Sequence, residues 1–283
     1  YRYDFFTGLA DKTQSFQISG ATLGLAKRLR VPDDFFQLSQ SISYQYYNLN
    51  NYYTGLFTFG DGQANNLAYT VNLTRNNTRI NPIFPTGGST FSINAKFTPP
   101  YSLFSSKDYA NLGDLPEFQD ENGNPIPEKI DQEKYRWLEF YKIKFNGTWY
   151  TPIYEKLTLK TQADFGFIGA YNLSRGNIPF ERFFLGGDGM VSYALDGRET
   201  IALRGYPNQS LSSTDGSVIY NKFSLELRYP ITLKPSASIY ALTFLEAGKG
   251  YNNFREFNPF ISKRSAGAGV RIFMPAFGLL GID

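Results

Sequence analysis

The sequence predicts an all-β protein: a transmembrane antiparallel β-barrel, of which this chain carries about ten or eleven strands. The first observation is that long segments alternate apolar and polar residues with a period of two, as strands do. The second is that aromatic residues gather near the ends of these segments. The third is that the connections alternate between short and very long, as turns and loops on opposite sides of a membrane do.

The alternating segments begin near Phe16 and again near Gln37. The period is clean in residues 67–74 and 90–98, and in the second of these the side chains that point one way are those of Phe91, Ile93, Ala95 and Phe97. It continues to near Leu279, through residues 141–149, 157–167, 223–229 and 266–272. Many of these segments are longer than the roughly five or six residues usual in globular sheets.

A soluble β-sandwich and a membrane barrel both fit an alternating pattern. A sandwich buries its apolar face against a second sheet, whereas a barrel turns that face to lipid and the polar face to a wet lumen. The barrel is favoured by the strand length and by aromatic side chains that resemble an interfacial girdle, among them Tyr44, Tyr46, Tyr47, Tyr52, Tyr53, Trp149 and Tyr150. It is also favoured by short turns such as Pro152-Ile153-Tyr154 beside long connections at 100–134 and 172–217.

Composition excludes several kinds of site. The chain of 283 residues has no cysteine and no histidine, so it cannot hold a disulfide, a thiolate metal site or a Ser-His nucleophile pair. Its formal charge of +3 is small and dispersed, which argues against nucleic acid as a partner. Without a constellation of nucleophile and base, we expect no enzymatic activity, no catalytic residue and no cofactor.

Two acidic or glycine-rich stretches look like ligand sites and are not expected to be. Residues 120–124 have the composition of a calcium loop, but their spacing fails the EF-hand pattern. Residues 186–189 are not a phosphate-binding loop, because neither the Lys-Ser/Thr pair nor a helix follows them. We therefore expect no metal site and a solvated loop at 120–124.

The candidate site is the glycine-rich stretch 183–206. It contains the pair Gly186-Gly187 and ends with Leu203-Arg204-Gly205-Tyr206, in which the arginine follows a hydrophobic residue. Such an arginine needs an anionic partner, and carboxylates follow in the next two strands, at Glu226 and Glu246.

Strand parity places one of these carboxylates inward. Glu226 alternates with Leu225 and Leu227, which are expected to face lipid. Glu246 is less clear, because the residues of its parity are Tyr240, Leu242 and Phe244. We place it inward as well, because a lipid-facing carboxylate would be costly. A guanidinium offers a planar fork suited to bidentate carboxylate contact, and the hypothesis is that Arg204 pairs with Glu246 and Glu226.

These residues resemble motifs of the BamA family of outer-membrane assembly factors, whose relatives include two-partner secretion transporters. Residues 203–206 fit the family's motif of an aliphatic residue, Arg, Gly and an aromatic residue in its sixth extracellular loop. Further segments that resemble the family are 81–88 (NPIFPTGG), 226–230 (ELRYP), 244–248 (FLEAG), and 266–271 (AGAGVR) with Pro275 and 278–283. Glu246 departs from the pattern, since the family usually has Asp there.

The resemblance implies a C-terminal barrel domain over residues 1–283, part of an expected 16-stranded barrel. It implies that the periplasmic POTRA repeats, the first strands (apart from an end at 1–6) and the last strand are not in this chain. It also implies that residues 172–217 form an extracellular loop that folds into the lumen, where Arg204 meets the wall.

The implied function is that of an insertase, which folds and inserts β-barrel proteins into the bacterial outer membrane. Its implied partners are client barrel proteins, accessory lipoproteins and other assembly subunits, lipopolysaccharide and phospholipid. The alternatives are a two-partner secretion transporter, which exports a passenger protein, and a passive porin. The Tyr- and Asn-rich composition and residues 25–34 resemble Bacteroidota members of the family.

Overall fold

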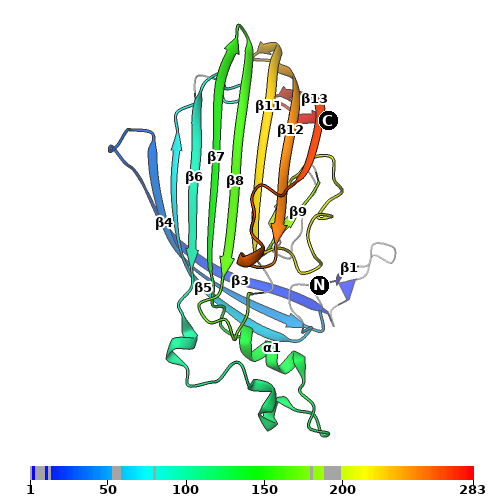
Figure 1. The fold of residues 1–283 in the computed structure, drawn as a ribbon. Coiled ribbons are helices and arrows are strands. Elements are labelled where there is room, and N and C mark those ends of the chain that lie inside the picture. The colour runs from blue at the N-terminus through cyan, green and yellow to red at the C-terminus, as the bar shows by residue number, and fades with distance from the viewer. Residues whose placement is uncertain are drawn as a thin grey trace.

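A ten-stranded antiparallel sheet forms the body of the protein (Figure 1). The computed structural model describes residues 2–3, 10–11, 14–52, 59–78, 81–178, 181–187 and 199–283. Strand neighbours follow the order β14-β13-β12-β11-β8-β7-β6-β5-β4-β3, so β14 and β3 are the two edges. The strands are β3 (Ser15–Arg28), β4 (Phe36–Asn50), β5 (Gly62–Asn76), β6 (Gly88–Phe97), β7 (Tyr141–Tyr154), β8 (Leu157–Gly169), β11 (Ile219–Lys234), β12 (Ala237–Tyr251), β13 (Lys263–Met274) and β14 (Gly278–Ile282).

The sheet curves, and its two faces differ as the alternation predicts. On β11, the outward side chains of Leu225, Leu227 and Tyr229 are exposed, at 42%, 37% and 52% of their surface. The alternating residues Glu226 and Arg228 are buried on the concave face. An apolar outer face over long antiparallel strands is the pattern of a membrane barrel and not of a two-layered sandwich. The predicted fold class is confirmed.

The connections separate the two ends of the sheet. At one end, called here the short-turn end, lie the connections β3–β4, β5–β6, β7–β8, β11–β12 and β13–β14. At the other, the long-loop end, lie β4–β5, β6–β7, β8–β11 and β12–β13 (Figure 1). One detail of the prediction was wrong: Pro152-Ile153-Tyr154 belongs to β7, at a register shift, and the turn itself is Glu155-Lys156. Glu155 takes the positive φ, 44°, that the tight turn requires.

The β6–β7 connection contains more structure than the sequence predicted. It holds the short helices η1 (Tyr101–Phe104), η2 (Leu112–Asp114) and η3 (Pro116–Phe118) and the helix α1 (Pro127–Tyr135). Pro127 begins α1, where a missing N–H costs nothing, yet no side chain of the helix is fully buried. Without an apolar stripe, α1 gave no periodic signal. Among the described residues, the helices are all too short or too polar to cross a membrane.

The β8–β11 connection, residues 170–218, is called here the long connection. It contains β9 (Phe183–Leu185) and β10 (Glu199–Ile201), which pair in parallel. All three residues of β9 are buried, and Phe183 and Leu185 pack in a core cluster with Ile219, Tyr220 and Tyr251 of the sheet. Residues 188–198, the middle of the glycine-rich stretch, lie outside the described residues, as do 1 and 4–6 of the expected N-terminal strand end. The described Arg2–Tyr3 (β1) pairs with Ala10–Asp11 (β2) in a separate two-stranded sheet.

Candidate functional site

The glycine pair Gly186-Gly187 holds together the two arms of the long connection, residues 181–187 (the first arm) and 199–206 (the second arm). Gly187 pairs with Leu203 in an isolated bridge, and its N–H donates to the carbonyl of Tyr206 at 2.9 Å. Both glycines have positive φ, 120° and 94°. A Cβ on Gly186 would lie 2.4 Å from the backbone oxygen of Pro207. These positions therefore need glycine for both conformation and space.

The motif 203–206 lies across two strands of the concave face. Leu203 is fully buried against Gly248 of β12. A Cβ added to Gly248 would lie 3.3 Å from Cδ1 of Leu203. Gly205 has a φ of 82° and approaches Ser265 of β13 equally closely. The hydroxyl of Tyr206 donates to the carbonyl of Arg264, also on β13, at 2.7 Å. These contacts hold the backbone around Arg204 against the wall independently of the charge on its side chain.

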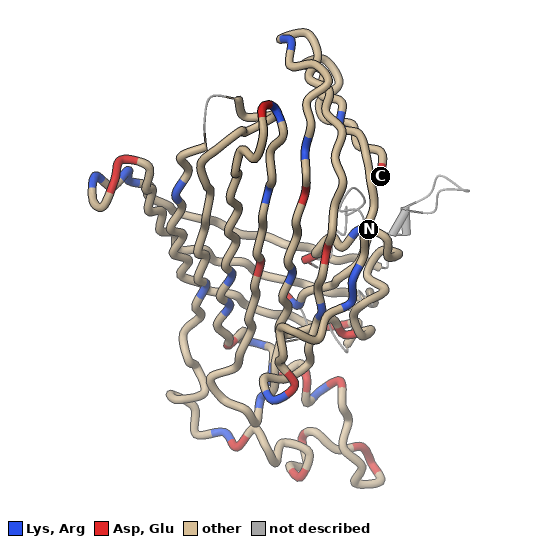
Figure 2. The backbone as a smooth tube through the Cα atoms, turned by 45° about the horizontal axis from the view of Figure 1, so that its top comes forward, with Lys and Arg blue, Asp and Glu red and all other residues tan. Residues whose placement is uncertain are grey.

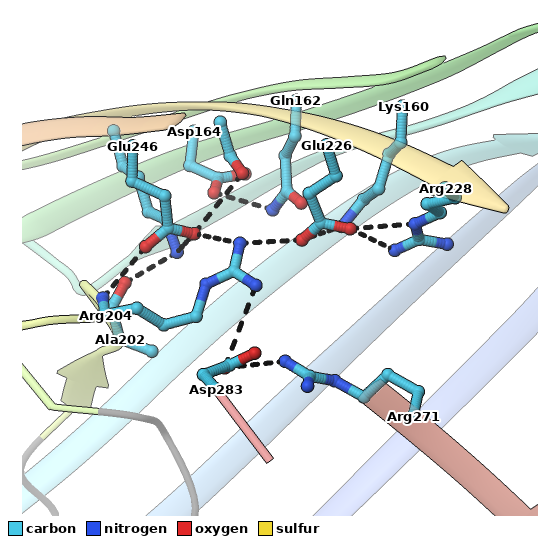
Figure 3. Close-up of polar contacts among 12 residues, drawn as sticks. Lys160, Gln162, Asp164, Ala202, Arg204, Glu226, Arg228, Glu246, Arg271 and Asp283 are labelled. Carbon is cyan, nitrogen blue, oxygen red and sulfur yellow. Dashed lines mark hydrogen bonds and ion pairs between the residues drawn. The ribbon is translucent and has the colours of Figure 1, made fainter. Parts of the chain in front are cut away.

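The structure brings together Arg204, Glu226 and Glu246 (Figure 3). Nη2 of Arg204 lies 2.7 Å from Oε1 of Glu226 on β11 and 2.8 Å from Oε1 of Glu246 on β12. The backbone N–H of Arg204 donates to the other oxygen of Glu246 at 2.8 Å. The guanidinium carbon lies 3.8 Å from the ring centroid of Phe244, a cation–π contact.

This geometry differs from the fork expected from sequence. A single guanidinium nitrogen bridges two carboxylates, instead of two nitrogens gripping one. It is Glu246 that is gripped at both oxygens, once by the side chain and once by the backbone of Arg204. The extra methylene of glutamate is therefore accommodated, and the side chain of Glu246 is only 3% exposed.

Further cations surround the two carboxylates, and sequence reasoning missed them. Lys222 lies 3.4 Å from Glu246 and donates to the carbonyl of Ala202 at 2.6 Å. Nε of Arg228 donates to Glu226 at 2.8 Å, and Lys160 of β8 lies 3.7 Å from the same carboxylate. We call these residues, with Arg204, Glu226 and Glu246, the arginine cluster. Strand parity could have found them, because Lys222 and Arg228 share the inward parity of Glu226.

A second group of charges holds both arms of the long connection, through Glu181 in the first and Glu199 in the second. Glu181 contacts Lys96 of β6 and lies 3.1 Å from Lys142 of β7. Glu199 lies 2.6 Å from Lys142 and 2.8 Å from Lys144. We call these five residues the lysine cluster. Figure 2 shows such charges part-way along the strands as well as in the connections.

The polarity of the lysine cluster is the reverse of that in the arginine cluster, since here the wall is basic and the connection acidic. Burial alone would raise the pKa of Glu181, but Lys142 and Lys96 outweigh it and hold that pKa at about 2. At neutral pH Glu181 is therefore ionised, and its contacts with Lys96 and Lys142 are ion pairs.

The remaining expectations concern ligands. Within the described residues, no group of three or more acidic side chains is arranged to hold a metal ion. The carboxylate of Asp120 instead accepts hydrogen bonds from the backbone of Asn122 and Asn124, at 2.9 and 2.8 Å. This is a self-contained turn in which local donors occupy the oxygen atoms that a cation would need.

A family model described as the Omp85 superfamily domain matches residues 3–283. Among solved structures, the chain is similar to BamA from Haemophilus ducreyi lacking POTRA domains 1-3, at 17% identity and a TM-score of 0.62, over 95% of this chain and 50% of that one. It is also similar to CdiB from Escherichia coli, at 14% identity and a TM-score of 0.48, over 92% of this chain and 39% of that one. Among curated proteins, no significant match was found.

The BamA comparison bears on the fold. The chain spans about half the length of that BamA structure, and nearly all of the chain takes part in the match. The open, curved sheet thus has the fold of part of a BamA-type barrel.

Proposed function

The chain belongs to the Omp85 superfamily, and from that premise we propose that it is the barrel part of an insertase that folds and inserts β-barrel proteins into the outer membrane. Membership places it among the outer-membrane β-barrel proteins of Gram-negative bacteria. The proposal includes the orientation, with the short-turn end toward the periplasm and the long-loop end outside the cell. It also includes a Bacteroidota source, which rests on sequence resemblance.

The observation that supports this function is the anchoring of the long connection by Arg204. The connection crosses the concave face and is tied to β11 and β12 through one buried guanidinium. An ion pair of this kind stabilises only when all its charges are matched, so it fixes one position of the connection. A passive porin needs an open lumen for diffusion. A connection held across the interior instead suits an insertase, whose barrel must keep its shape while client strands bind to its wall.

The proposed work is mechanical and makes no chemical bond. Client barrels in the process of folding offer unpaired strand edges, and backbone pairing with an exposed sheet edge gives affinity without sequence specificity. Accessory lipoproteins, other assembly subunits, lipopolysaccharide and phospholipid complete the proposed set of partners. No cofactor is needed, and the protein is proposed not to be an enzyme.

A depletion experiment separates this function from the alternatives. Cells depleted of the full-length protein are expected to lose many unrelated outer-membrane barrel proteins at once, measured by quantitative proteomics of outer membranes. Loss of a single secreted passenger with intact barrel proteins would instead identify a two-partner secretion transporter. Unchanged barrel proteins and passengers, with reduced uptake of small solutes, would identify a porin.

Complementation of the depleted cells then tests the anchor. Arg204→Ala is expected to fail to restore barrel-protein levels, while Arg255→Ala, an exposed arginine in the β12–β13 connection, restores them. Equal rescue by both variants would show that the arginine cluster has no part in assembly.

A further inference from the structure

The β5–β6 connection reaches across the concave face to a strand that is not its neighbour. Phe84 of this connection is fully buried and packs on Tyr240, Leu242 and Phe244 of β12. Its ring lies 5.2 Å from that of Tyr240, edge to face. In the sheet, β7, β8 and β11 separate β6 from β12. The contact therefore spans the interior and does not run along the wall.

The connection is built to hold Phe84 in that position. The side-chain oxygen of Asn81 accepts the backbone N–H groups of Ile83 and Phe84, at 2.9 and 3.1 Å, and prolines at 82 and 85 limit the backbone on either side. Gly88, with a φ of 91°, closes the turn where a Cβ would lie 2.3 Å from the carbonyl of Asn77. The turn is therefore rigid, and it places one buried aromatic side chain against β12.

The partner surface on β12 is unusual for a barrel interior, which is normally polar. Tyr240, Leu242 and Phe244 all face inward and are at most 6% exposed. An apolar patch of this kind on an inner wall needs a cover, and within the described residues Phe84 and Ile83 provide it. Phe244 is also the ring beneath the guanidinium of Arg204. The β5–β6 turn and the long connection, which start from opposite ends of the sheet, thus meet on one strand.

We propose that residues 81–87 of the β5–β6 turn form an inner gate that closes the barrel interior at the short-turn end, with Phe84 as its contact and Tyr240, Leu242 and Phe244 as its seat. The gate acts in series with the long connection, which obstructs the interior from the long-loop end. Two obstructions in series have a testable signature, because relieving either one alone leaves the other in place. The inference goes beyond the proposed function, since it concerns passage through the interior and not the handling of clients.

Single-channel conductance of the full-length protein in planar bilayers, in potassium chloride, tests the gate. Phe84→Ala and Arg204→Ala are each expected to raise conductance modestly, and the double variant to exceed the product of the two single effects several-fold. Thr86→Ala, at an exposed residue of the same turn, is the control and is expected to conduct as the wild type does. A double variant that conducts no more than Arg204→Ala alone overturns the proposal.

Crosslinking checks the seat directly and does not depend on conductance. The chain has no cysteine, so a pair can be introduced cleanly. A short bis-maleimide is expected to join Phe84→Cys to Tyr240→Cys in outer membranes, and not to join Phe84→Cys to Leu245→Cys, which lies on the opposite face of β12 and is 58% exposed. Equal crosslinking of both pairs, in protein that migrates as a folded barrel, contradicts the gate.

Discussion

At the scale of the residue, Arg204 is the point on which three segments converge. Its side chain bridges β11 to β12, and its backbone N–H is held by the same Glu246 that its guanidinium contacts. Burying a guanidinium in this way is costly unless every neighbouring charge is matched. Lys222 and Arg228 supply part of this matching. Lys222 lies beside the Glu246 oxygen that Arg204 also contacts, and Arg228 donates to the Glu226 oxygen that Arg204 leaves free. The cluster is therefore a network in which no pair acts alone.

Replacing Arg204 by lysine separates charge from shape. Arg204→Lys is expected to destabilise the folded barrel by about 2–3 kcal/mol, against about 3–5 kcal/mol for Arg204→Ala, which leaves two carboxylates without their shared cation. An ammonium on a flexible stem keeps the charge but loses the flat contact with Phe244 and the fixed bridge. The stability of both variants is measured by the temperature at which the folded, heat-modifiable band disappears in gel electrophoresis. Arg264→Lys, on the exposed side of β13, is the control, and a loss of the same size there would show that the effect is not specific to the cluster.

Glu181 gives the lysine cluster a defined pH dependence. Its pKa in the folded protein, about 2, lies below the ordinary value of 4.5. A carboxyl with a lowered pKa stabilises the fold fully above its unfolded pKa, and the contribution disappears as pH falls from about 4.5 toward 2. Glu181→Gln should therefore be less stable than the wild type at pH 7, by on the order of 2–3 kcal/mol, and nearly equal to it at pH 2. Denaturation followed at both pH values would measure this, and a constant difference between the proteins would exclude the ion pair as its source.

At the scale of the element, period-two alternation was sufficient to predict the strands, because one face of each strand lies in uniform surroundings. On β11, the polar parity faces inward and the apolar parity outward, as predicted, and Glu226 follows from that rule alone. On β12 the rule fails at its apolar residues. Tyr240, Leu242 and Phe244 face inward with Glu246, because the β5–β6 turn covers them. Alternation in a single strand cannot reveal a partner from 160 residues away, so only the cost of a lipid-facing carboxylate placed Glu246 correctly.

Elements stabilised from outside their own sequence were the ones missed. The lysine cluster pairs residues from β6, β7 and both arms of the long connection, and no local pattern links them. The helix α1 lies in a connection whose buried residues, such as Leu112 and Phe118, sit outside the helix itself. By contrast, the glycines at 186, 187 and 205 were recognisable, because glycine is the residue type that most readily adopts positive φ.

The close approach of the two arms of the long connection predicts a steric effect at Gly186. Gly186→Ala is expected to destabilise the connection by about 1–3 kcal/mol, since the new Cβ would combine positive φ with a backbone clash. Gly123→Ala is the matched control: its φ is also positive, 81°, but nothing lies within 4 Å of the Cβ, so only conformational strain remains. Hydrogen exchange at residues 181–187 and 199–206 reports the loss. If both variants exchange alike, crowding at Gly186 is unimportant.

At the scale of the whole molecule, the long connection is held by two charge clusters of opposite polarity on different strands of the wall. The arginine cluster places one cation of the connection between acidic groups of β11 and β12, while the lysine cluster places two acidic residues of the connection against β6 and β7. The lysine cluster holds both arms, through Glu181 and Glu199, while the arginine cluster holds the second arm alone, so loss of either cluster leaves the connection tethered at the other. Reversed polarity also prevents Arg204 and Glu199 from exchanging places, since each would meet charges of its own sign.

Two anchors on one segment predict a strongly non-additive response. Lys142 is the centre of the lysine cluster, 5% exposed in its side chain, contacting both Glu181 and Glu199 and lying 4.8 Å from the ring centroid of Phe183. Lys142→Ala and Arg204→Ala should each accelerate hydrogen exchange in residues 199–206 only partly, because the remaining anchor keeps a high effective concentration of the connection at the wall. The double variant should exchange in that segment much faster than the product of the two single effects, while residues 237–251 of β12 stay protected. Rates that simply multiply would mean that the clusters act independently and that the connection is not one tethered unit.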